Sequence, residues 1–300
     1  MPAETTMKGQ YSIKDLEKIT GIKAHTLRIW EKRYGVIEPM RTDTNIRYYT
    51  DEQLRKVLNI AILNNYGIKI SKIVGLSPEA LHKKVVEIGN EEVTESVQME
   101  SLVVAMVEMD ETRFEKILVN CTIRLGFEQT MMKVIYPFFK KVGLLWQTGA
   151  INPAQEHFMS NLIRQKLIVA IDSQALMAKK ESSKFLLFLP EGELHEIGLL
   201  FYSYLIHKAG HKVIYLGQSV PVQDVITVDR YNPADFILTS VMSMSSEADI
   251  NALLIRLLEA FPKRKILITN KLESTENLVK DDRLFLNTDL EDFKAMLNEI

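Results

Sequence analysis

Between residues 184 and 300, short apolar runs alternate with segments of helical periodicity, and this alternation constrains the fold more than any other feature of the sequence. Each run is long enough for one strand, and the segment after it is long enough for a helix that returns to the next strand. The pattern predicts a doubly wound parallel sheet. The expected strands are 185–189, 213–216, 236–241, 266–269 and 284–286, and the expected helices lie near 197–207, 222–228, 247–260 and 290–298.

The segment 193–198, with the sequence ELHEIG, directly follows the first of these strands. Open α/β sheets bind their ligands at the carboxyl ends of the strands, and His195 is expected there. An imidazole at this place could ligate a metal ion, and Gly198 would let a large group approach the backbone. Gly217, after the second strand, and Ser240, near the end of the third, are expected at the same edge of the sheet.

Residues 91–180 predict a four-helix bundle, with helices near 97–107 and over 111–125, 127–146 and 153–178. Trp146 ends the third helix, and Glu156 and His157 begin the fourth, so a short loop would hold the three side chains at one end of the bundle. An indole, a carboxylate and an imidazole together could cover the face of a large planar ligand. The alternative is a core tryptophan beside a helix-start pair in which the helix dipole favours Glu156.

The N-terminal part of the chain is basic and the C-terminal part is acidic. Residues 1–90 have a net charge of +5, and residues 181–300 have a net charge of −6. This asymmetry predicts that only the N-terminal part binds a polyanion. A capping box at residues 12–15 begins a short helix, Thr20-Gly21 ends it, and a second helix is expected over 23–34. This layout is that of a helix-turn-helix, whose second helix enters the major groove of DNA.

The second helix is expected to bury Leu27, Trp30 and Tyr34, which recur at helical spacing. The residues left to face a partner are Lys23, His25, Thr26 and Arg33, with Arg28 at the flank. Residues 39–49 predict a short hairpin with arginines on both arms, and a further helix is expected over about 51–64. The alternative for this basic face is a helical module that binds another protein.

These N-terminal motifs closely resemble the winged helix-turn-helix of the MerR superfamily. They are TLRIWEKRYG at 26–35, Pro39-x-Arg41 and Arg47-Tyr48-Tyr49, and the resemblance covers roughly residues 10–78. It implies that the helix over 23–34 reads double-stranded promoter DNA, while Arg28, Arg41, Arg47 and Tyr48 contact phosphates. Phosphate contacts position a protein, and contacts with base edges give it sequence preference. Because a MerR-type domain reads paired half-sites, a homo-oligomer, dimer or tetramer, is expected.

The rest of the chain resembles cobalamin-binding proteins. Trp146, followed after nine residues by Glu156-His157, resembles the cap motif of cobalamin-binding helical bundles. The segment around His195 resembles the Asp-x-His-x-x-Gly motif of cobalamin-binding α/β domains, as do the segments at Gly217 and Ser240. The three regions in this order are similar to light-responsive regulators that use adenosylcobalamin.

This resemblance implies a role for each matching residue. His195 would ligate cobalt from below, and Glu193 would orient its other ring nitrogen. Trp146 would shield the upper adenosyl group, Glu156 would hydrogen-bond it, and His157 could bind cobalt after photolysis. Loss of the adenosyl group would shift the bundle, break the oligomer and release DNA.

Two positions depart from the family pattern. Glu193 stands where the family has Asp, and Thr269-Asn270 stands where it has a Gly-Gly pair beside the nucleotide tail. Side chains at residues 269 and 270 would crowd that tail. One alternative is therefore a MerR-type regulator with a degenerate, cofactor-free sensor that a partner controls. Another alternative is a corrinoid-carrying enzyme module. The sequence has no nucleophile triad, zinc-ligand spacing or phosphate-binding glycine loop. We therefore predict that the protein is a regulator and not an enzyme.

The expected fold class is multidomain, α plus α/β. It consists of a winged helix-turn-helix over 1–80, a four-helix cap bundle over 91–180 and a cobalamin-binding-like α/β domain over 183–300. The single cysteine, Cys121, excludes an intramolecular disulfide and fits a reducing compartment. The sequence lacks a secretory leader and any run of roughly 18 apolar residues, so a cytoplasmic protein outside the membrane is expected.

Overall fold

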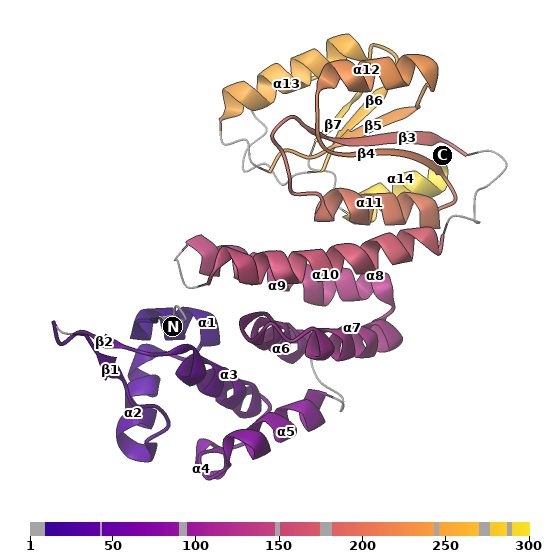
Figure 1. The fold of residues 1–300 in the computed structure, drawn as a ribbon. Helices are drawn as coiled ribbons and strands as arrows, with labels where there is room; N and C mark the ends of the chain where they lie inside the picture. Colours follow the sequence, from indigo (N-terminus) through magenta and orange to yellow (C-terminus); the bar gives the residue numbers. More distant parts are fainter. Residues whose placement is uncertain are drawn as a thin grey trace, which may run out of the picture. The chain divides into compact units, whose positions relative to one another are not determined.

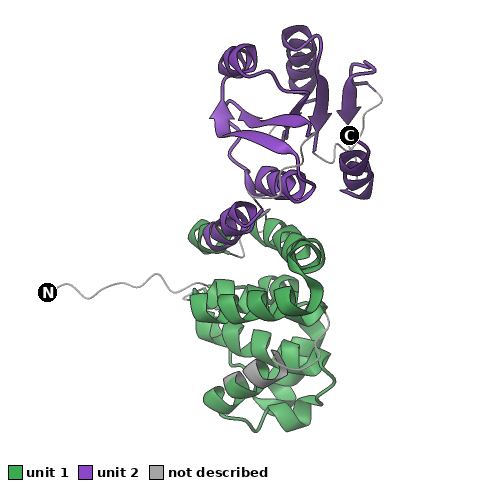
Figure 2. Cartoon of the chain, turned by 90° about the vertical axis from the view of Figure 1, so that its right-hand side faces the viewer, with its two compact units in different colours: residues 1–160 green, residues 161–300 purple. Residues whose placement is uncertain are grey.

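The computed structural model describes residues 10–42, 44–89, 95–147, 151–174, 182–242, 246–269, 277–286 and 290–300. The chain divides into two compact units, residues 1–160 and 161–300, which Figure 2 shows in green and purple. None of the described helices is both long and apolar enough to cross a membrane. The three-domain division predicted above remains a prediction.

The first unit begins with the expected helix-turn-helix and hairpin. Its elements are α1 (Ile13–Thr20), α2 (Ala24–Tyr34), β1 (Met40–Arg41), β2 (Arg47–Tyr48), α3 (Asp51–Asn65), α4 (Ile70–Ile73) and α5 (Pro78–Gly89). The side chain of Ser12 accepts a hydrogen bond from the Asp15 amide in a complete capping box. Gly21 ends α1 at φ +74°, a conformation that costs a glycine little. The turn between α1 and α2 therefore follows directly from the local sequence.

The second part of this unit is helical. Its elements are α6 (Glu95–Glu108), α7 (Glu111–Leu125), α8 (Phe127–Thr130), a π-helical turn η1 (Met131–Ile135), α9 (Tyr136–Gln147) and α10 (Pro153–Asp172), the last of which continues into the second unit. Most of α6 is buried, because it packs against α3 as well as against α7, η1 and α9. The helix-turn-helix region and the bundle thus share α6 as a common core helix.

Helix α10 is shorter than the sequence predicts. It ends at Asp172, and Ser173 and Gln174 form a turn in which Ser173 Oγ donates to the carbonyl of Ala170. A serine that bonds the backbone in this way competes with helix continuation. Residues 175–178, the rest of the predicted helix, lie outside the described residues.

The second unit contains a five-stranded parallel sheet. Its elements are β3 (Lys184–Pro190), α11 (Ile197–Lys208), β4 (Lys212–Val220), α12 (Val222–Tyr231), β5 (Phe236–Thr239), α13 (Glu247–Ala260), β6 (Lys265–Ile268), β7 (Leu284–Leu286) and α14 (Leu290–Glu299). The strand order is β4-β3-β5-β6-β7. Helices α12 and α13 cover one face of the sheet, and α11 and α14 cover the other (Figure 1). This is the predicted doubly wound sheet.

The order in which strands are added to the sheet reverses at β3: β4 lies on one side of it, and β5, β6 and β7 lie on the other. Ligands of doubly wound sheets bind at the carboxyl ends of the strands at such a point. Strand β3 is almost fully buried, which fixes the position of the loop that follows it. That loop carries His195.

Candidate functional site

The outward face of α2 is the candidate DNA-reading surface. Leu27 and Trp30 are buried on the opposite side of this helix. His25, Ile29 and Lys32 are exposed, and their spacing of four and three residues places them on one face. This outward face therefore carries an imidazole, an apolar side chain and an ammonium group.

The other residues predicted to meet DNA from α2 flank this outward face. Arg28 and Arg33 are exposed, and the guanidinium of Arg33 lies 5.5 Å from the centre of the Tyr34 ring. Thr26 is half-buried. Lys23 precedes the helix, and its Nζ lies 3.1 Å from a carboxylate oxygen of Glu17. Lys23, Arg28 and Arg33 are thus accessible to a ligand that binds the outward face of α2.

Sequence reasoning missed Ile29 and Lys32. The same helical spacing that buries Leu27 and Trp30 directs both of them outward, so the information was present in the sequence. Arg28 and Arg33 were predicted because of their charge. The charge of Lys32 is the same kind of signal, whereas an isoleucine has no charge that would indicate a contact with DNA.

The hairpin has two different faces. Met40 pairs with Tyr48 and Arg41 pairs with Arg47, and paired residues of an antiparallel hairpin point to the same side. Arg41 and Arg47 therefore share a basic face, and both are exposed. Arg41 Nη1 donates to Oδ1 of Asn45 over 2.6 Å, which holds the guanidinium at the turn of the hairpin.

Glu31 connects this hairpin to α2. One of its carboxylate oxygens lies 3.8 Å from Arg47 Nη1, and the other accepts a hydrogen bond from the Tyr49 hydroxyl over 3.3 Å. Burial, followed by the charge of Glu31, raises the pKa of Tyr49 to about 12, so the phenol stays protonated and donates. The hairpin is therefore braced against the helix that carries the outward face.

His195 follows β3 and is held by a buried carboxylate. Its Nδ1 lies 2.6 Å from Oε1 of Glu193, and the same oxygen accepts hydrogen bonds from the backbone amides of Leu194 and His195. The imidazole is 62% exposed, whereas the Glu193 side chain is 3% exposed. With Nδ1 bound to Glu193, Nε2 is the ring nitrogen that would ligate a metal.

The end of β4 fixes the loop that carries His195. Gln218 Nε2 donates to the carbonyl of Leu194, and the amide of Ser219 donates to the carbonyl of Glu193. Gly217, at φ +84°, begins the bend that brings these groups to the loop. On the other side, a Cβ at Gly198 would meet no other part of the described chain within 4 Å. The loop is rigidly held, and the backbone beside it is open.

Glu196, the neighbour of His195, joins three elements of the second unit. Its carboxylate is buried, forms an ion pair with Arg164 of α10 and accepts a hydrogen bond from the Tyr215 hydroxyl of β4 over 3.1 Å. Burial and the charge of Glu196 raise the pKa of Tyr215, which remains a donor. Glu196 was not among the predicted site residues, because its partners lie 32 and 19 residues away along the chain.

The carboxyl ends of β5 and β6 lie side by side in the sheet. Ser240 is buried directly after β5. The amide of Thr269 donates to the carbonyl of Thr239 over 3.0 Å, and its hydroxyl lies 3.4 Å from the same oxygen. The Thr239 hydroxyl is buried and has no hydrogen-bond partner among the described residues. Asn270, the second residue of the predicted obstruction, lies outside the described part of the chain.

The predicted residues of the bundle lie at the helix ends expected from the sequence. Trp146 is in the last turn of α9 and is 60% exposed. Glu156 and His157 are in the first turn of α10, and His157 Nδ1 lies 3.0 Å from a carboxylate oxygen of Glu156. An indole with this exposure is not a core residue of the first unit, so the alternative of a core tryptophan is wrong.

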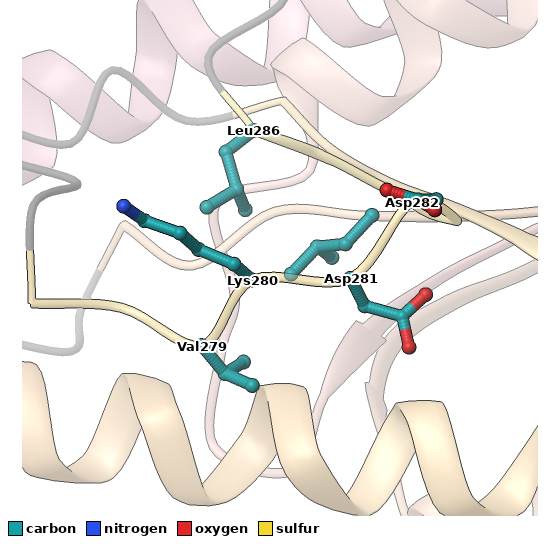
Figure 3. Close-up of a pocket in the computed structure, with 6 residues that line it drawn as sticks. Val279, Lys280, Asp281, Asp282 and Leu286 are labelled. Atoms are coloured by element: carbon teal, nitrogen blue, oxygen red, sulfur yellow. The ribbon is translucent and has the colours of Figure 1, made fainter.

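A pocket of about 350 Å³ lies beside the edge strand β7 (Figure 3). It is lined by Val279, Lys280, Asp281, Asp282, Leu284 and Leu286. None of the predicted cofactor residues lines it. The described residues contain no cluster of three histidine, cysteine, aspartate or glutamate side chains that could bind a metal ion on their own.

Two parts of the chain match known families. Residues 11–79 match the MerR HTH family regulatory protein, and residues 98–170 match the B12 binding domain. The second match contains Trp146, Glu156 and His157. The chain therefore carries a MerR-type helix-turn-helix region followed by a B12-binding-domain segment.

Two curated relatives span most of the chain. The HTH-type transcriptional repressor CarH of Myxococcus xanthus is 28% identical over 259 residues, which cover 84% of this chain and 86% of CarH. The repressor CarA of the same organism is 28% identical over 217 residues, which cover 70% of this chain and 68% of CarA. A monomethylamine corrinoid protein of Methanosarcina barkeri aligns with a TM-score of 0.53 and 17% identity over 65% of this chain and 95% of its own, which shows a shared fold.

Proposed function

We propose that this chain, which carries a MerR-type helix-turn-helix and a B12-binding domain and is homologous to the CarH and CarA repressors, is a DNA-binding transcription regulator with cobalamin as its effector. The two relatives that span most of the chain are repressors, which supports a regulatory and not an enzymatic role. Its DNA target would be a double-stranded promoter. A regulator of this kind would act in the cytoplasm.

The observation that carries cobalamin binding is the contact between His195 Nδ1 and Glu193. A buried carboxylate fixes the ring through one nitrogen and makes the other a good metal ligand. Since the described residues offer no further cluster of metal ligands, a metal at His195 would have to bring its remaining ligands with it. Cobalamin would meet this requirement, because it would supply the metal together with its other ligands.

The residues around His195 fit a large ligand. The open space at Gly198 leaves the backbone accessible there. The unpaired, buried hydroxyl of Thr239 could bond a polar group of the ligand at the carboxyl end of β5, next to Ser240. In this proposal, Trp146, Glu156 and His157 of the bundle make the remaining contacts with the cofactor.

The finer part of the proposal concerns the cofactor and the switch. Adenosylcobalamin, when bound, would supply a light-sensitive cobalt–carbon bond. In this proposal Trp146 would shield the adenosyl group, Glu156 would hydrogen-bond it, and His157 would serve as a ligand for cobalt in its absence. A dimer or tetramer that depends on the bound adenosyl group would then dissociate and release DNA.

Absorption spectroscopy tests cobalamin binding directly. Full-length protein is mixed with adenosylcobalamin in darkness, freed of excess ligand by gel filtration, and measured before and after illumination. We expect a bound corrinoid spectrum that is lost in His195→Ala and retained in His207→Ala, the same substitution elsewhere in the second unit. Gel filtration of the same samples reports the oligomer, and titration with promoter DNA reports DNA affinity.

A cofactor-free regulator is the second candidate. Thr269 favours this candidate. Its hydroxyl and its amide both lie at the carbonyl of Thr239, so its side chain occupies the edge of the sheet where the nucleotide tail of cobalamin is expected. A wild-type protein that binds DNA but leaves gel filtration colourless would support this candidate and contradict cobalamin sensing.

A further inference from the structure

The most exposed large apolar side chains among the described residues 10–65 lie on α2 and on the hairpin. Within residues 10–65, apart from the undescribed residue 43, those that are at least half exposed are Ile29 at 52%, Met40 at 50% and Ile46 at 64%. Ile29 lies on α2, and the other two lie on the hairpin. The other large apolar residues of α1, α2 and α3 are buried or half-buried. Ile29 is therefore an apolar side chain of α2 that is available to a partner outside the chain.

Ile29 lies at the centre of the outward face of α2. His25 precedes it by one turn and Lys32 follows it by nearly one turn on the same face. Arg28 and Arg33 flank this face and are also exposed. In a major groove, cations at the borders of the helix meet the phosphates of the two strands. The side chain at the centre meets the edges of the bases.

We propose that Ile29 is a specificity-determining residue that contacts the methyl group of a thymine in each half-site; this inference rests on the proposed DNA-binding function. The thymine C5-methyl is the apolar feature that base edges present in the major groove. Opposite any other base edge, the isoleucine would displace water from polar groups and leave them without hydrogen bonds. Ile29 therefore favours thymine and disfavours the alternatives at one position.

Replacing thymine by deoxyuridine tests this proposal, because the two bases pair identically and differ only in the methyl group. The probe is the tightest duplex selected from a random pool by the full-length protein, with each thymine replaced in turn. For wild type we expect one thymine in each half-site at which the replacement raises Kd about fourfold, the effect of one methyl buried against an apolar group. In Ile29→Ala this penalty should disappear, and in Ile29→Val it should become smaller.

Two further variants serve as controls. Ile255→Ala makes the same change at an exposed position of α13 in the second unit and should keep both the affinity and the deoxyuridine penalty of wild type. Ile46→Ala makes the same change on the hairpin. It should keep the wild-type increase in Kd on deoxyuridine replacement, whatever its effect on overall affinity. A penalty that vanishes only at residue 29 supports the proposal.

Two results would overturn the proposal while DNA binding stands. One is a wild type that binds the selected duplex equally well with every thymine replaced. The other is a penalty that persists in Ile29→Ala, since the methyl would then act through the shape of the DNA. A protein that selects no duplex from the pool would overturn the proposed function together with this inference.

Discussion

Nη2 of Arg113 in α7 lies 3.5 Å from Oδ1 of Asn59 in α3, and both side chains are buried. Nη1 of the same guanidinium lies 3.0 Å from a carboxylate oxygen of Glu108. Burial lowers the pKa of Arg113, and the charge of Glu108 offsets part of this shift. The guanidinium remains charged, as it does in proteins generally. The contact joins the helix that follows the hairpin to the bundle, so these two parts of the first unit share a buried polar link.

Replacing Arg113 by methionine should destabilise the first unit by about 2 kcal/mol, because Asn59 and Glu108 would lose a charged donor in a buried place. Both tryptophans of the chain, Trp30 and Trp146, lie in this unit, so tryptophan fluorescence during urea unfolding reports its stability. Lys116→Met, an exposed position on the same helix, should change the stability by less than about 0.5 kcal/mol. Equal effects of the two variants would show that the link contributes nothing.

Glu193→Gln should weaken cobalamin binding by about 10- to 100-fold, because a neutral amide orients the imidazole of His195 less strongly than a carboxylate does. Titration of the protein with cobalamin, followed by absorbance, measures the affinity. Glu191→Gln changes an exposed carboxylate two residues earlier and is the control, with no change expected. An unaltered affinity in Glu193→Gln would show that His195 does not depend on the buried carboxylate to bind the cofactor.

Arg28→Ala should weaken binding to all DNA sequences alike and reduce the salt dependence of the affinity by about one counterion per protomer, as loss of a phosphate contact does. The slope of log Kd against log salt concentration measures this. Arg47→Ala should have a smaller effect, because Glu31 lies 3.8 Å from the Arg47 guanidinium and already offsets part of its charge. Arg256→Ala, exposed on α13, should leave the slope as it is in wild type.

Replacing both Thr269 and Asn270 by glycine should tighten cobalamin binding by about fivefold if their side chains crowd the nucleotide tail, which corresponds to about 1 kcal/mol. The comparison needs cobinamide, a corrinoid that lacks the nucleotide tail, as a second ligand. Its affinity should not change. A variant that gains affinity for neither ligand would clear the two side chains of obstruction.

The thiol of Cys121 should react slowly with thiol reagents in the native protein. Burial raises its pKa from 9.0 to about 11, and its side chain is 4% exposed. The folded state therefore holds the proton more tightly than the unfolded state. The contribution of this group to stability is complete below pH 9 and is lost as the pH rises from 9 to 11. Colour development with a disulfide reagent near pH 8, compared with the protein in concentrated guanidinium, measures the reactivity, and equal rates would contradict this account.

The local sequence was sufficient to predict most of the fold. Ser12 begins α1 with the predicted capping box, whose hydrogen bonds join residues only three positions apart. The structure adds a second capping box at the start of α3, formed by Thr50 and Gln53. The five apolar runs became five strands of one parallel sheet, and those of the three central strands β3, β5 and β6 are almost fully buried. Helix α5 was not predicted, although its amphipathic pattern is as clear as that of α7; its packing against α3 arises only in the folded chain.

The candidate site was predictable only where its contacts are local. Glu193 lies two residues from His195, so the sequence motif alone suggested their contact. The ion pair of Glu196 with Arg164 joins residues that are 32 positions apart, and the contact of Arg47 with Glu31 depends on how the hairpin folds back on α2. Such contacts depend on tertiary geometry, which the order of residues does not reveal.

Helix α10 passes through residues 160 and 161, where one compact unit gives way to the other along the chain. A boundary of this kind is a poor place to divide the protein. A fragment that starts or stops there would carry a severed helix whose newly exposed amides or carbonyls have lost their partners. Truncated versions intended for separate expression should therefore keep α10 whole.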